Sequence, residues 1–217
     1  MGSANPAPLG LAFAARLPAA LTGLMLVLFL LAHLTGVGIA LPAPALFEAW
    51  ATSLHHSFWL PPAELTLLAI AAIHAVFSLI KRLDNRRAGN TAQLRSRRRD
   101  PLGPMAALAA RSQAVAGVVL LVFLGVHLLQ LRLHRPPDGA ELAALQAVLA
   151  QPLNRVFYVL AALALALHLF HGGESAHRSL GLLDPSNAAR IRVAARTLAI
   201  LLGGGFTAAT LAIGWLG

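Results

Sequence analysis

Long apolar segments alternate with short polar connections along this chain, and the apolar segments predict helices. A membrane-spanning helix needs about 20 mainly apolar residues to cross about 30 Å of hydrocarbon, and five segments meet this requirement. They lie near residues 17–40, 63–80, 112–133, 153–177 and 193–216. The pattern therefore predicts an all-α integral membrane protein, in which residues 1–217 form one transmembrane domain of five helices.

The connections between these segments predict smaller elements. Residues 45–60 hold two phenylalanines and two tryptophans, and because aromatic side chains favour the membrane interface, we expect a short interfacial helix there. Residues 141–151 predict a second short helix, and residues 81–111 form the longest connection. The run Gly203 to Gly205 in the last segment is typical of close helix packing.

The composition supports a membrane location. Hydrophobic residues make up 58% of the chain and charged residues 12%, with a mean hydropathy of +0.71, which is too apolar for an ordinary soluble domain. The first apolar segment is too long for a signal peptide, so we expect it to be a retained span. The chain has no cysteine, which excludes disulfides, thiolate-bound iron–sulfur clusters and CxxCH haem attachment.

The net charge of +9 raises the question of nucleic-acid binding, but the basic residues gather at the ends of apolar segments. They crowd the second and fourth connections: Lys81, Arg82, Arg86, Arg87, Arg95, Arg97, Arg98, Arg99 and Arg111, then Arg178, Arg190, Arg192 and Arg196. Because positive charge favours the cytoplasmic side, both connections should be cytoplasmic, with the N-terminus inside and the C-terminus outside. We therefore expect a multi-pass protein of the cytoplasmic (inner) membrane that binds no nucleic acid.

Two parts of the chain superimpose without a gap. Residues 23–78 align with residues 117–172 at an offset of 94. The alignment pairs Gly23 with Gly117, Phe29 with Phe123, His33 with His127 and His74 with His168. Each copy is an apolar segment, a connection and a returning apolar segment, and each apolar segment carries one of these histidines. An ionisable residue inside a membrane is expensive, so four at matched positions indicate a shared partner.

Depth in the membrane divides the four histidines into two pairs. His33 lies 17 residues beyond Arg16 and His127 lies 16 beyond Arg111. At a rise of 1.5 Å per residue, both sit about 25 Å from the inner boundary. His33 and His127 therefore form an outer pair.

The second pair lies closer to the inner side. His74 precedes Lys81 by 7 residues and His168 precedes Arg178 by 10. These separations place both histidines about 10 to 15 Å from the inner boundary. Two histidines per layer, from different helices, match a bis-histidine haem b, so the first four helices should form a bundle that binds two haems b.

Other uses of these histidines fit less well. Zinc needs ligands that converge on one point within about 2 Å, which two separate layers do not offer. A proton relay would recruit Asp or Glu inside the spans, and the first, third and fifth segments have none. His171 is the main rival ligand because it follows His168 by three residues. His55, His56, His134 and His177 are expected at the surfaces, although His55 and His56 could line a quinone pocket.

At these histidines the chain resembles the cytochrome b membrane subunit of dihaem succinate:quinone oxidoreductases and quinol:fumarate reductases. The resemblance covers most of residues 16–190 and rests on the stretches TGLMLVLFLLAHL, IHAVFSLIKR, AGVVLLVFLGVHLLQ and HLFHGGESAHRSLGLLDP. In that family a glycine follows the fourth ligand by four residues, and Gly172 stands in that relation to His168. The resemblance therefore favours His168 over His171.

The resemblance implies a role in an enzyme complex. The chain would anchor a flavoprotein subunit and an iron–sulfur subunit at the cytoplasmic face, and dicarboxylate chemistry would occur on the flavoprotein. Electrons would pass between a quinone, menaquinone by resemblance, and those subunits, in fumarate reduction or succinate oxidation. A glutamate after the first helix accepts protons from quinol in the fumarate-reducing branch, so Glu48 and then Glu64 are the candidates here. A dimer of such heterotrimers is compatible with this reading.

The chain also departs from the family pattern. Some members carry a glutamate two residues before the fourth ligand for transmembrane proton movement, and Ala166 stands at that position here. Polar residues that meet haem propionates in the family are partly replaced by alanines, and we expect Arg111, Gln113 and Arg178 to substitute for them. The sequence leaves two alternatives open: the cytochrome b anchor of another dehydrogenase or reductase, such as a formate or nitrate enzyme, and a non-haem transporter with histidine gates.

Overall fold

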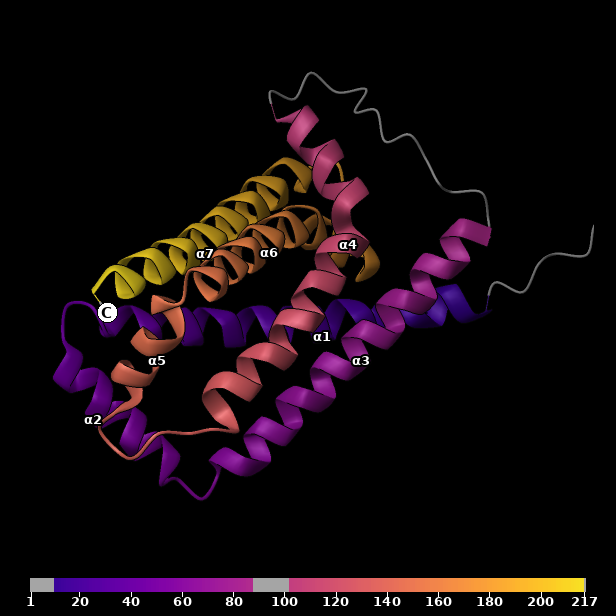
Figure 1. Cartoon of the computed structure of the whole chain (residues 1–217). Coiled ribbons are helices and arrows are strands. Elements are labelled where there is room, and N and C mark those ends of the chain that lie inside the picture. The colour runs from indigo at the N-terminus through magenta and orange to yellow at the C-terminus, as the bar shows by residue number, and fades with distance from the viewer. Residues whose placement is uncertain (1–9, 88–101, 217) are drawn as a thin grey trace, which may run out of the picture.

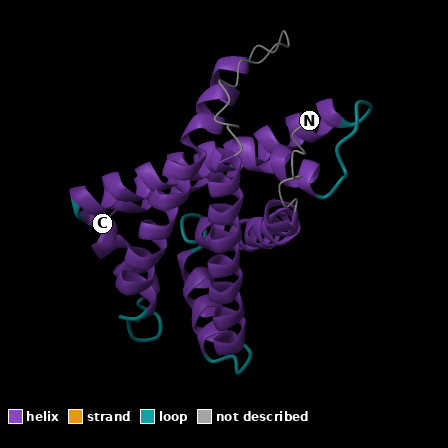
Figure 2. Ribbon diagram, turned by 90° about the vertical axis from the view of Figure 1, so that its right-hand side faces the viewer, coloured by secondary structure: helices purple, strands orange, loops and turns teal. Residues whose placement is uncertain are grey.

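The computed structural model describes residues 10–87 and 102–216, and every regular element in these residues is a helix (Figure 2). In chain order these are α1 (Gly10–Ile39), α2 (Pro44–His55), α3 (Leu60–Arg87), α4 (Gly103–His127), the π-helix η1 (Leu128–Arg132), α5 (Glu141–Ala150), α6 (Pro152–Ser179) and α7 (Ala188–Leu216). The part of the basic connection at 88–101, with Arg95, Arg97, Arg98 and Arg99, lies outside the described residues.

The prediction of five membrane-spanning segments is confirmed at the level of helix length and composition. Among the described residues, α1, α3, α4 with η1, α6 and α7 are long and apolar enough to cross a membrane, which fits a multi-pass membrane protein. The predicted short helices at 45–60 and 141–151 correspond to α2 and α5.

The long helices extend further than the apolar segments do. The prediction ended the second segment at residue 80 and began the third at residue 112, whereas α3 continues to Arg87 and α4 begins at Gly103. The early start of α4 is compatible with Pro104, which stands in the first turn, where its missing N–H costs no hydrogen bond. The predicted connection at 81–111 is therefore shorter by the residues that the two helices include.

The helices are arranged as two antiparallel pairs and a fifth helix. α1 packs along α3, α4 packs along α6, and α7 lies beside α6 (Figure 1). The short helices α2 and α5 contact each other at one end of the bundle, where the C-terminal part of α7 also packs against α5. We call this the α2/α5 end; the C-terminal end of α3, the N-terminal end of α4 and the connection from α6 to α7 lie at the opposite end (Figure 1).

A cluster of buried apolar residues lies at the α2/α5 end. It comprises Ala40, Phe47, Leu149, Tyr158, Ala209 and Ile213. In contrast, α3 and α4 expose long apolar surfaces that include Leu65, Leu79, Val115 and Val118. A soluble protein would bury such surfaces, whereas lipid or another apolar partner covers them in a membrane protein.

Glycine and alanine bring α6 and α7 close together. A Cβ built on Gly203 would lie 2.5 Å from the Cβ of Ala166, and one on Gly173 would lie 2.5 Å from the Cβ of Ala195. The predicted packing role of the glycine run is thus confirmed for Gly203 and also for Gly205, where a Cβ would lie 2.6 Å from Cδ2 of Leu34 in α1, whereas Gly204 faces no atom within 4 Å. Small residues at such crossings let helix backbones approach, as in other membrane helices.

Candidate functional site

The structure brings the four repeated histidines together in the two predicted pairs. The ring centres of His33 in α1 and His127 in α4 are 5.9 Å apart. Those of His74 in α3 and His168 in α6 are 6.2 Å apart. Each pair joins one helix of the α1–α3 hairpin to one helix of the α4–α6 hairpin, and all four imidazoles are half-buried.

The two pairs lie at different levels of the bundle. His74 contacts α1 beside Gly23, which precedes His33 by ten residues, and His168 contacts α4 beside Gly117, which precedes His127 by ten. Ten residues of α-helix span about 15 Å, so the pairs are separated by roughly that distance along both helices. The pair His33–His127 lies nearer the α2/α5 end.

Backbone carbonyls hold the imidazoles of the pair His74–His168. The Nδ1 of His74 lies 3.0 Å from the carbonyl oxygen of Ala19, and the Nδ1 of His168 lies 3.3 Å from that of Gln113. In both cases the carbonyl belongs to the residue 55 positions earlier, on the other helix of the hairpin. A carbonyl only accepts, so Nδ1 carries the proton and Nε2 keeps the lone pair that binds metals.

Two glycines leave space for these imidazoles. A Cβ on Gly23 would lie 3.0 Å from Cε1 of His74, and a Cβ on Gly117 would lie 3.5 Å from Cε1 of His168. Gly23 and Gly117 thus each face a histidine of their own hairpin, whereas Gly172 faces the amide nitrogen of Gln113 at 3.6 Å. Among these glycines, Gly23 has the tightest contact.

Aromatic rings surround the pair His33–His127. Phe29 stacks on His33 with a ring-centre distance of 5.4 Å, and Phe123 stacks on His127 at the same distance. The ring of Phe206 from α7 lies 5.8 Å from His33. These contacts restrict how far either imidazole can turn.

A polar network extends from His127 toward the α2/α5 end. The Nδ1 of His127 lies 3.3 Å from the hydroxyl of Tyr158, which donates to Oε1 of Gln130 at 2.9 Å. Gln130 donates to Oδ1 of Asn154 at 3.2 Å, and Asn154 donates to the carbonyl of Val148 at 3.0 Å. Sequence reasoning missed this network, although Tyr158 is the chain's only tyrosine and lies in an apolar segment.

The two acidic candidates have defined partners. The carboxylate of Glu64 on α3 forms a two-point ion pair with Arg132 of η1, with Nε–Oε1 and Nη2–Oε2 distances of 2.5 and 2.8 Å. The carboxylate of Glu48 on α2 accepts the backbone N–H groups of Glu141 and Leu142, at 3.1 and 2.8 Å. Glu48 therefore caps the first turn of α5, where unpaired N–H groups attract negative charge.

The candidates for propionate binding differ in their surroundings. Gln113 has a buried side-chain oxygen with no hydrogen-bond partner among the described residues, which is an open polar position beside His168. Arg178 pairs with Glu174 at 2.9 Å, and Arg111 is exposed. The structure also presents Lys81, whose Nζ donates to the hydroxyls of Ser175 and Ser179 at 3.2 and 3.3 Å. Sequence reasoning treated this lysine only as a topology signal.

The remaining histidines make other contacts. The Nδ1 of His55 lies 3.0 Å from Oε1 of Glu141, and the Nε2 of His56 lies 2.7 Å from Oδ2 of Asp138. His56 and Arg135 hold the pKa of the Asp138 carboxyl below its ordinary value. The other two contact backbone carbonyls: His134 with that of Leu129 and His177 with that of Gly173. No ring contact joins His171 to another histidine among the described residues, so the prediction of His168 as the partner of His74 agrees with the geometry.

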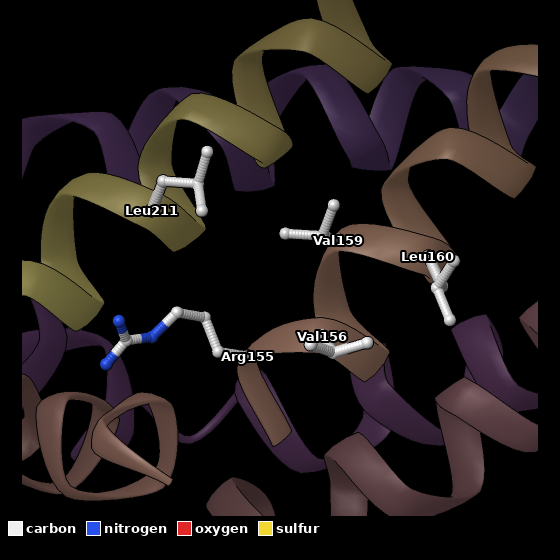
Figure 3. Close-up of a pocket in the computed structure, with 5 residues that line it drawn as sticks. All are labelled: Arg155, Val156, Val159, Leu160 and Leu211. Carbon is white, nitrogen blue, oxygen red and sulfur yellow. The ribbon is translucent and has the colours of Figure 1, made fainter. Parts of the chain in front are cut away.

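A shallow apolar hollow lies between α6 and α7 (Figure 3). It has a volume of about 250 Å³ and is lined by Arg155, Val156, Val159, Leu160 and Leu211. The guanidinium of Arg155 is fixed by the carbonyl oxygen of Leu149, to which its Nε donates at 2.9 Å. None of the predicted site residues lines this hollow.

Within the described residues, no three His, Asp or Glu side chains converge as ligands of one metal ion. The histidines instead occur as two separate pairs. Comparisons with protein-family models, with curated proteins and with solved structures found no match.

Proposed function

We propose that this chain is a dihaem cytochrome b that anchors a quinone-dependent fumarate reductase or succinate dehydrogenase in the cytoplasmic membrane. His33 and His127 would hold the outer haem b, and His74 and His168 the inner one. The haems would carry single electrons between quinone and the other subunits. The dicarboxylate reaction would belong to the flavoprotein subunit, so this chain is part of an enzyme without holding its dicarboxylate site.

The observation that carries the proposal is the spacing of the paired imidazoles. A histidine nitrogen lies about 2 Å from a metal that it binds and about 1.2 Å from the centre of its own ring. Two imidazoles on opposite faces of one haem iron therefore have ring centres about 6.3 Å apart. The distances of 5.9 and 6.2 Å agree with this value.

Ordinary aromatic pairs span about 4.5 to 7 Å, so one such distance would decide little. Here the same spacing occurs twice, at matching positions of two hairpins, in polar rings on otherwise apolar helices. At the inner pair, carbonyls orient both Nδ1 atoms and leave both Nε2 atoms for a ligand. Internal repeats also occur in transporters, so the ring spacing and the orientation of the Nε2 atoms, rather than the repetition, favour haem ligation over histidine gates.

The chain also supplies polar groups where the inner haem would need them. Propionates are anionic and would meet Lys81, which lies two helical turns from His74 on the same face of α3. Lys81 is held by two serine hydroxyls and has no carboxylate partner among the described residues. The buried oxygen position of Gln113 offers a second contact, since its amide can present N–H there after a flip.

At the outer haem, Glu64 and Glu48 are the candidates to accept quinol protons. Glu64 stands on α3 within reach of Arg132, so protonation would weaken that ion pair. Glu48 would have to release the first turn of α5. We assign the α2/α5 end to the outside and the basic connections to the cytoplasm, where the flavoprotein and iron–sulfur subunits would bind. Menaquinone remains the proposed quinone, by resemblance.

The experiment is a haem count on the purified chain, by pyridine haemochrome and by reduced-minus-oxidised spectra. We expect two haems b per chain. His33→Ala or His127→Ala should remove one, and His74→Ala or His168→Ala the other. A chain without haem would refute the proposal and leave the transporter alternative. Two haems in a complex, purified with its partner subunits, that shows no fumarate- or succinate-linked haem oxidation or reduction would point to the anchor of a different dehydrogenase.

A further inference from the structure

The two histidines of the pair His33–His127 have unequal hydrogen bonding. Tyr158 lies beside His127, and its side chain is 6% exposed. A buried tyrosine hydroxyl needs a partner, and this one has two, the imidazole and Gln130. For His33 the structure shows ring contacts with Phe29, Phe206 and His127, and no hydrogen bond to another described residue.

The direction of the network is fixed at its far end. The carbonyl of Val148 only accepts, so the amide nitrogen of Asn154 faces it and Oδ1 of Asn154 faces Gln130. Gln130 must therefore donate to Asn154 and accept from Tyr158. Turning either amide around would place two acceptors or two donors against each other.

The direction of these hydrogen bonds also fixes which ring nitrogen of His127 carries the proton. Because the Tyr158 hydroxyl gives its one proton to Gln130, its oxygen can only accept from His127. The Nδ1 of His127 therefore carries a proton, and Nε2 keeps its lone pair. The carbonyl of Val148 in α5 thus determines the tautomer of His127 through the side chains of Asn154, Gln130 and Tyr158.

The π-helix η1 places Gln130 in this network. A π-turn inserts one residue into a helix and changes the direction of the side chains that follow. Here the π-turn begins directly after His127, and the N–H of Leu133 donates to the carbonyl of Leu128 at 2.8 Å. Gln130 and Arg132 both stand in η1, the first bonded to Tyr158 and the second to Glu64.

We propose that Tyr158 is a positioning residue for the outer haem: its hydroxyl holds His127 in the tautomer that coordinates iron through Nε2. This inference rests on the proposed function. An imidazole that donates a hydrogen bond through Nδ1 is a stronger electron donor through Nε2, which favours the oxidised iron. Loss of the Tyr158 hydroxyl should therefore raise the midpoint potential of the outer haem.

The test is Tyr158→Phe in the full-length chain, purified with its partner subunits where these are present. The phenyl ring keeps the edge-on contact with Phe123, whose ring centre lies 4.8 Å away, so packing should be retained. We expect two haems b by pyridine haemochrome, an outer midpoint potential shifted upward, altered low-spin ferric EPR g-values for that haem and an unchanged inner haem. Combining Tyr158→Phe with His74→Ala, which removes the inner haem, assigns the shift to the outer haem.

Two further variants keep the test decisive. Asn154→Leu breaks the network at its far end without touching His127 and should raise the same potential by a smaller amount. Phe157→Leu changes the neighbouring residue, which contacts Phe123 and has no side chain that hydrogen-bonds in the network, and should leave both potentials unchanged. Two haems with unchanged potentials and g-values in Tyr158→Phe would overturn the inference, whereas a wild-type chain without haem would overturn the proposed function instead.

Discussion

Glu64 and Arg132 form a two-point ion pair between helices of different hairpins, α3 and the η1 extension of α4. α3 makes most of its helix contacts with α1, so this pair is a main link between α3 and the second hairpin. Both side chains are about one-third exposed. Arginine–carboxylate pairs with two parallel hydrogen bonds are the strong form of such contacts.

We expect Arg132→Gln to destabilise the chain more than Glu64→Gln, because it leaves a partly buried carboxylate without its cation. The expected loss is about 1 to 2 kcal/mol, below the range for fully buried pairs because both groups are partly solvated. The double variant should recover part of this loss. Denaturant unfolding in detergent measures all three, and additive single losses would show that the pair is not coupled.

The different contacts of Gly23 and Gly117 give a matched prediction. A Cβ at Gly23 would lie 3.0 Å from His74, whereas one at Gly117 would lie 3.5 Å from His168, an ordinary contact. Gly23→Ala should therefore displace the His74 ring by a few tenths of an ångström, and Gly117→Ala should not displace His168. We expect reduced inner haem occupancy in the first variant alone, measured by haem content per chain. Equal losses in both variants would contradict this prediction.

The helix pattern and the histidine pairs could be predicted from sequence because both follow from spacing. Apolar segment length fixes the number of long helices, and a rise of 1.5 Å per residue places each histidine at a depth. Depth alone sorted His33 with His127 and His74 with His168, and the ring distances agree with that assignment. The helix ends were less predictable because polar and proline-containing turns can extend a helix beyond its apolar segment.

The partners of the polar side chains could not be predicted in the same way. The contact of Glu64 with Arg132 joins residues 68 positions apart. Its geometry depends on the π-turn in η1, which no local sequence pattern predicts. The role of Glu48 as a cap for α5 likewise depends on how α2 and α5 meet. The roles of Tyr158 and Lys81 could not be predicted because each side chain hydrogen-bonds to residues of another helix.

The contact between Gly203 and Ala166 predicts that a glutamate will not fit at position 166. A Cβ on Gly203 would already lie 2.5 Å from the Cβ of Ala166, so α7 covers this position. Ala166→Glu should force α6 and α7 apart and cost about 2 kcal/mol or more. Gly203→Leu should act similarly, whereas Gly204→Ala, which faces no atom within 4 Å, serves as the control. Wild-type stability for Ala166→Glu in detergent unfolding would show that the helices separate easily there.

The choice between His168 and His171 as the inner ligand gives the last prediction. His168 lies 6.2 Å from His74 and donates to the carbonyl of Gln113, so its Nε2 is oriented for a ligand. His171 stands almost one helical turn further along α6 and makes no ring contact with His74. We therefore expect His168→Ala to lose one haem per chain and His171→Ala to keep both.

The same two variants also differ in their expected effect on the haem midpoint potentials. His171→Ala should leave both midpoint potentials near their wild-type values, because the ligand and its bond to Gln113 remain in place. Pyridine haemochrome and redox titration measure the two outcomes separately. Retention of both haems in His168→Ala, with loss of one in His171→Ala, would reverse the assignment. Because side chains three residues apart on a helix point about 60° from each other, α6 would then have to turn by about 60° toward His74 when haem binds.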